Sequence, residues 1–90
     1  MIDDYIKVPD KRFDVGDEVN VSTFMLSSGN VVVIEQPFIA SVIAIRKHYP
    51  YGWMYDLEGE GVYLSPVDNE AHSAKHWTNI PESALLEAIA

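Results

Sequence analysis

Aromatic side chains alternate with other residue types between positions 49 and 55, and two carboxylates follow within three positions. In an extended strand, side chains two positions apart point to the same side. The rings would therefore form one row if the strand begins at Tyr49. Rings bordered by carboxylates attract a cation such as Arg, Lys or methylated Lys. The predicted ligand surface comprises Tyr49, Tyr51, Trp53, Asp56 and Glu58.

A second interpretation of the same residues is open. Aromatic side chains dominate the cores of small domains. Trp53 and Tyr55 would then be buried, and Tyr49 and Tyr51 would border the turn that contains Pro50. The two interpretations differ in whether the Trp53 ring is enclosed.

Other constellations give weaker signals. His72 and His76 are spaced as two ligands on one helical face, with Asp68 and Glu70 nearby, but no third ligand has diagnostic spacing. We therefore expect solvated histidines, no metal and no cofactor. The chain has no cysteine, and no serine lies in a G-x-S-x-G motif. These patterns favour a protein that is not an enzyme.

The net charge of the chain disfavours some classes of binding partner. Fourteen acidic residues oppose six Lys and Arg, which gives a net charge of −8. Binding to phosphates depends on Lys and Arg, so direct binding to nucleic acid or to an anionic membrane is not expected. The excess of acidic residues has two possible roles. It keeps the protein soluble, or it mimics the phosphates of a nucleic acid and so blocks a protein that binds nucleic acid. We expect a cytoplasmic protein.

Short apolar runs separated by turn residues predict strands. We expect an N-terminal arm at 1–12 and one domain at 13–90. The predicted strands are a first one ending near Val21, then 31–34, 38–47, 53–57, 62–65 and 76–79. The residues Glu58-Gly59-Glu60-Gly61 predict a tight hairpin turn, 66–75 a loop, and the end of the chain from Asn79 a short helix. The expected core is Val19, Val21, Val42, Ile45, Tyr55, Leu57, Val62, Ile80 and Leu85.

One segment carries a resemblance to known proteins. The residues Phe13-Asp14-Val15-Gly16-Asp17-Glu18-Val19-Asn20-Val21 resemble the F-x-V-G-D-x-V-x-V opening of SH3-like barrels, a group that includes Tudor-like and KOW-like domains. Ile80-Pro81-Glu82-Ser83-Ala84-Leu85 resembles their closing I-P-E-x-x-L turn. The resemblance implies an all-β fold, a small SH3-like barrel of five to six strands with a short C-terminal helix. The long stretch between Val21 and Val42 implies an inserted hairpin.

The fold alone does not imply a function, because such barrels host many activities. We expect a non-enzymatic protein-binding or assembly module, which recognises a basic or proline-containing peptide through the predicted ligand surface. The alternative is an acidic inhibitor or mimic from a phage or mobile element, where small acidic barrels of this kind also occur. The uncharged run Val31-Val32-Val33-Ile34 is either covered inside the monomer or forms a contact between two chains, since an exposed edge without charge invites pairing. We expect the second, a homodimer.

Overall fold

The computed structural model describes residues 10–26, 28–48 and 52–88. Five strands form an antiparallel sheet in the order β6-β5-β4-β1-β7, and β2 pairs with β3 in a separate hairpin. The all-β expectation is therefore confirmed. The elements are β1 (Glu18–Val21), β2 (Phe24–Met25), β3 (Val31–Val32), β4 (Phe38–His48), β5 (Gly52–Leu64), β6 (Ala71–Pro81), the 3-10 helix η2 (Glu82–Ala84) and β7 (Leu85–Glu87).

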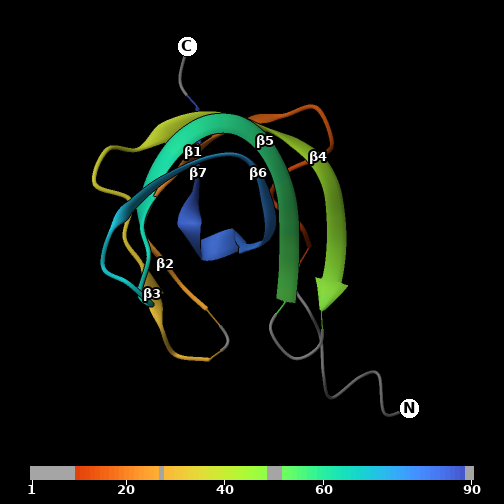
Figure 1. The fold of residues 1–90 in the computed structure, drawn as a ribbon. Helices are drawn as coiled ribbons and strands as arrows, with labels where there is room; N and C mark the ends of the chain where they lie inside the picture. The colour runs from red at the N-terminus through yellow and green to blue at the C-terminus, as the bar shows by residue number, and fades with distance from the viewer. Residues whose placement is uncertain (1–9, 27, 49–51, 89–90) are drawn as a thin grey trace.

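The three long strands bend over the short ones. Figure 1 shows β4, β5 and β6 arching around β1 and β7. The pairing register shifts between Val42 and Ala44 in β4, and between Glu58 and Gly61 in β5. Such bulges bend a strand and increase its twist. The bent sheet is not closed, since β6 and β7 form its two edges.

The predicted hairpin turn at 58–61 is wrong, because β5 runs through it without interruption. Gly59 and Gly61 instead allow β4 to pack closely against β5. A Cβ atom on Gly59 would lie 2.7 Å from the backbone oxygen of Ile39, and one on Gly61 would lie 2.4 Å from the ring of Phe38. A glycine inside a strand often marks such an approach of another segment.

The turn between β5 and β6 is shorter than the predicted loop at 66–75. The N–H of Ser65 donates to the backbone oxygen of Glu70, and the N–H of Asn69 donates to that of Ser65. Strand β6 then begins at Ala71 and is longer than the predicted strand at 76–79. Its side chains lack a clear apolar period because β6 is an edge strand with much of its surface exposed.

The predicted C-terminal helix is wrong for the described residues. The chain forms the single turn η2 and then the strand β7, which pairs with β1 so that Leu85 lies opposite Val21. Both the backbone N–H and the hydroxyl of Ser22 donate to the backbone oxygen of Ala84. An isolated helix of about ten residues is marginal, whereas pairing with β1 satisfies the backbone and buries Leu85.

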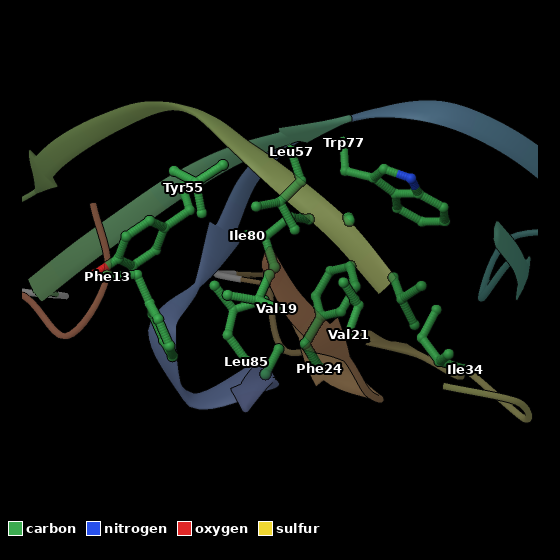
Figure 2. Close-up of a cluster of buried hydrophobic side chains, with 14 residues drawn as sticks. Phe13, Val19, Val21, Phe24, Ile34, Tyr55, Leu57, Trp77, Ile80 and Leu85 are labelled. Carbon is green, nitrogen blue, oxygen red and sulfur yellow. The ribbon is translucent and has the colours of Figure 1, made fainter. Parts of the chain in front are cut away.

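The core fills the space beneath the arch. Figure 2 shows it as a continuous row, from Phe13 and Tyr55 at one end to Trp77 and Ile34 at the other. Most of the expected core is confirmed, and Ile45 is partly buried. The expectation for Val62 is wrong, since 51% of its surface is exposed. The confirmed residues are Val19, Val21, Val42, Tyr55, Leu57, Ile80 and Leu85.

The hairpin expected between Val21 and Val42 is present as β2 and β3. Val32 and Ile34 of the uncharged run are buried in the molecule's own core. The N–H of Ile34 donates to the hydroxyl of Thr23, which holds the end of the hairpin in place. Val31 stays exposed on the outer side.

Candidate ligand surface

Strand β5 positions the described members of the predicted ligand surface. Trp53 lies opposite Lys47 of β4, and Tyr55 lies opposite Ile45. Both aromatic side chains therefore point to the concave side of the sheet. Tyr55 is fully buried, so this ring belongs to the core. Tyr49 and Tyr51 lie outside the described residues, and the row of four rings stays a prediction.

Trp53 lies at the edge of the core. Its side chain is partly buried and packs against the core cluster. The ammonium nitrogen of Lys47 lies 5.7 Å from the centre of the Trp53 ring, a distance at which the ring attracts a cation. The face of the Trp53 ring thus lies near a cation that belongs to the chain itself.

The acid that contacts the Tyr55 side chain is Glu82, which belongs to the Ile80–Leu85 segment and not to the predicted ligand surface. Its carboxylate accepts a hydrogen bond of 2.5 Å from the Tyr55 hydroxyl and one of 3.1 Å from the backbone N–H of Arg12. Burial, together with this bond to Glu82, raises the pKa of Tyr55 to about 12. The I-P-E-x-x-L segment was the available signal, since it places Glu82 directly after β6.

The same carboxylate holds the N-terminal segment against the core. The ring of Phe13 meets that of Tyr55 edge to face, with centres 5.8 Å apart. The guanidinium of Arg12 lies 5.0 Å from the centre of the Phe13 ring. This end of the molecule therefore combines aromatic rings, one carboxylate and two cations that belong to the chain itself.

Asp56 is separated from Trp53 because it lies on the other side of β5. Its two carboxylate oxygens each lie 2.6 Å from a guanidinium nitrogen of Arg46, and one also accepts the backbone N–H of Asn79. The bond from Arg46 is the main cause that lowers the pKa of Asp56. These contacts give Asp56 a structural role that joins β4, β5 and β6.

Glu58 also lies apart from the Trp53 ring. It is exposed, and its carboxylate lies 3.3 Å from the His76 ring nitrogen on β6. The structure thus leaves Trp53, Asp56 and Glu58 in three different environments. The acid that contacts Tyr55 on the concave side is Glu82.

A second cluster lies at the turn between β5 and β6. Ligand atoms of Asp68, Glu70 and His72 all lie within 4.8 Å of one another. The Asp68 carboxylate contacts the His72 ring at 2.9 Å, and His72 stacks on Tyr63. The pKa of Asp68 is lowered, first by the backbone N–H of Glu70 and then by His72. His76 is directed to Glu58 instead, so the histidine pair of the sequence does not converge.

No family model, curated protein or solved structure matches this chain. Within the described residues, none of the helical structure has the length and apolar character needed to cross a membrane.

Proposed function

We propose that this protein is a non-enzymatic binding or assembly module, built on an SH3-like barrel, that recognises a basic or proline-containing peptide of another protein. The fold proposal is supported by the hairpin between β1 and β4 and by the segment from Ile80 to Leu85, which forms the turn into β7. The resemblance of the 13–21 segment points the same way.

The binding proposal depends on the position of Lys47 over the Trp53 ring. The contact identifies a partly buried indole whose face accepts a cation. Arg12 repeats the arrangement over Phe13 at the same end of the core. A peptide carrying Arg or Lys would replace Lys47, and the carboxylate of Glu82 would add electrostatic attraction. The surface consists of Trp53 and Glu82, together with Tyr49 and Tyr51 if the row of rings extends to them.

An NMR titration tests this function. We would add the peptide Pro-Pro-Arg-Pro-Pro-Arg to the ¹⁵N-labelled protein and follow the indole N–H signals of Trp53 and Trp77. Trp77 is the internal control, because its ring is buried and its indole N–H already donates to the backbone oxygen of Gly59. The Trp53 signal should move with peptide concentration, and the affinity should fall with added salt, which screens exposed charges.

Two variants sharpen the test. Trp53→Leu should remove binding, while Tyr63→Leu, which alters a partly buried ring at the opposite end of β5, should retain it. A proline–arginine peptide that leaves the Trp53 indole signal unmoved would contradict the proposal.

A further inference from the structure

The second half of β5 has a strand on one side only. Its pairing with β4 ends where Ser41 lies opposite Glu58, whereas its pairing with β6 continues to Leu64. On the β4 side, the next partner is Val33, whose backbone oxygen accepts the N–H of Leu64 at 2.9 Å. Within the part of the chain that the structure describes, residues 59–63 of β5 therefore have no strand paired on that side.

A hollow of about 460 Å³ lies at this interruption. Its walls come from the segment after β3 and from the end of β5, and Phe38 packs on Gly61 next to it. A second hollow of about 430 Å³ lies on the other side of Val62, against β6. The first hollow is lined by Val33, Glu35, Gln36, Val62, Tyr63 and Leu64.

The walls combine apolar surface with exposed backbone edge. Val62, near the end of β5, is 51% exposed, and Val33, Tyr63 and Leu64 are partly buried. Tyr63 is fixed from behind, because its ring packs against Trp77 and stacks with His72. A wall that combines apolar side chains with polar ones, beside an unpaired strand edge, suits an extended peptide, which adds its backbone to the sheet and its side chains to the wall.

The charges at the mouth of the hollow distinguish between occupants. Glu35 is exposed and has no hydrogen-bond or ion-pair partner among the described residues. Glu60, which lines the second hollow, has a single exposed contact, with Lys75 at 3.6 Å. The chain as a whole carries a net charge of −8. A second copy would bring like charges together, whereas a segment with Lys or Arg would find a free carboxylate.

We propose that this hollow, which we name the β5 slot, binds an extended segment of a partner protein in which apolar and basic residues alternate. The segment's backbone pairs with β5 at residues 59–63, one apolar side chain packs on Val62, and a Lys or Arg contacts Glu35. The slot is separate from the Trp53 surface, because Trp53 lies at the start of β5 and Val62 near its end.

The probe for the β5 slot is the capped peptide Arg-Val-Arg-Val-Arg, added to the ¹⁵N-labelled protein. The amide signals of Val33, Val62 and Leu64 should shift. Glu35→Gln should weaken binding about two- to fivefold, as expected for one exposed ion pair. Val62→Thr keeps the branched shape of the side chain and should weaken binding about fourfold, through the loss of one buried methyl group.

Matched variants and peptides control for general attraction. Glu87→Gln removes an equal charge elsewhere on the surface, and Val67→Thr makes the same change at a valine that is 90% exposed in the turn. Neither should alter the affinity by more than the error. The peptide Arg-Gly-Arg-Gly-Arg has the same charge without apolar side chains and should bind at least about fourfold more weakly.

Several results would overturn the proposal. Equal effects of Glu35→Gln and Glu87→Gln would show general attraction to an acidic protein, and equal affinity for the glycine peptide would show that no apolar wall is used. Shifts confined to Trp53 and its neighbours would reject the slot while leaving the proposed function standing. Shifts at Val33, Val62 and Leu64 with an unmoved Trp53 signal would support the slot and count against the proposed function. An absence of binding, or occupation of the slot by a second copy of the chain, would also reject it.

Discussion

Glu82 joins three parts of the chain through one carboxylate. It accepts the hydroxyl of Tyr55 from β5 and the backbone N–H of Arg12 from the N-terminal segment, and it belongs to the turn before β7. The hydroxyl of Tyr55 must lose water to be buried, so its bond to Glu82 offsets a cost that an unpaired hydroxyl would retain. Glu82 therefore fixes Phe13 and Tyr55 in their edge-to-face contact.

This arrangement predicts a loss of stability at alkaline pH. The folded state raises the pKa of Tyr55 from 10.0 to about 12, because burial and Glu82 both disfavour the phenolate. The resulting stabilisation is fully present below pH 10 and is lost as the pH rises from 10 to about 12. Urea unfolding measured across this range should show the free energy of unfolding falling.

The variant Tyr55→Phe separates this effect from other alkaline changes. It should cost about 1–3 kcal/mol near neutral pH, because the carboxylate of Glu82 loses a hydrogen-bond donor. It should also remove the Tyr55 part of the alkaline loss. Tyr63→Phe serves as the control, since Tyr63 lies at the other end of β5. An unchanged alkaline profile in Tyr55→Phe would show that another group titrates there.

Lys47 offers a direct test of the Trp53 surface. If the Lys47 ammonium competes with a basic ligand for the ring face, Lys47→Gln should raise the affinity for the proline–arginine peptide. The expected gain is about two- to fivefold, the value of an exposed cation–π contact. Lys75→Gln removes the same charge near the far end of β5 and is the matched control. A gain of equal size in both variants would reflect net charge alone.

At the scale of elements, Gly61 shows how one residue type serves two structures. A glycine allows a tight turn, and it also allows another segment to approach a strand. Gly61→Ala would place a methyl carbon 2.4 Å from a ring carbon of Phe38, closer than two carbon atoms can approach. We expect a loss of about 1–3 kcal/mol, as for overpacking of a core.

Chemical denaturation of the double variant checks the cause of that loss. Phe38→Leu removes part of the obstructing ring, so Gly61→Ala should cost less in that background than in the parent protein. A neutral effect of Gly61→Ala in the parent would argue for an open turn at this position.

β7 gives a further test at this scale. Leu85→Ala should destabilise the protein by about 2–5 kcal/mol, because Leu85 is fully buried opposite Val21. Its neighbour Leu86 is 59% exposed, and Leu86→Ala should change the free energy of unfolding by less than about 0.5 kcal/mol. Similar losses in both variants would contradict the assigned orientation of β7.

Local pattern predicted the elements wherever one face is buried. The alternation of Val19 with Val21 and of Tyr55 with Leu57 was sufficient to place both pairs in the core. The end of the chain was different, since β7 exists because β1 lies beside it, more than sixty residues earlier. No property of Leu85, Leu86 and Glu87 taken alone favours a strand over a helix strongly enough to decide.

The candidate site was harder to predict than the strands. Carboxylate type and spacing suggested that Asp56 would accompany the rings, but its partner Arg46 comes from the neighbouring strand and holds it on the opposite side. Glu82 joins the rings because the turn into β7 brings it beside Tyr55. Pairings of this kind depend on the tertiary fold and leave no periodic signal in the sequence.

At the scale of the whole molecule, the basic residues that the structure describes are already engaged. Each described Lys and Arg contacts either a carboxylate or an aromatic ring: Lys11, Arg46 and Lys75 contact acids, and Arg12 and Lys47 lie over rings. The net charge of −8 is therefore carried by acids with few competing cations. Such a surface attracts basic partners and opposes association of identical copies.

The electrostatic repulsion between two acidic copies affects the predicted homodimer. Burial of Val32 and Ile34 leaves Val31 as the exposed part of the run, and Met25 lies directly opposite it on β2. A dimer built on this pair should form more strongly at about 1 M salt than at about 0.01 M, because the Debye length falls from about 30 Å to about 3 Å. The affinity for basic peptides should instead fall as the salt concentration rises.

Sedimentation equilibrium at both salt concentrations decides the matter. Val31→Lys places a charge in the proposed contact and should yield a monomer at either concentration, whereas Val15→Lys makes the same change at an exposed valine before β1 and should leave the dimer intact. A parent protein that stays monomeric at high micromolar concentration in about 1 M salt, where repulsion is screened, would remove the homodimer. Val31 and Met25 would then be isolated apolar side chains, which are common on the surfaces of soluble proteins.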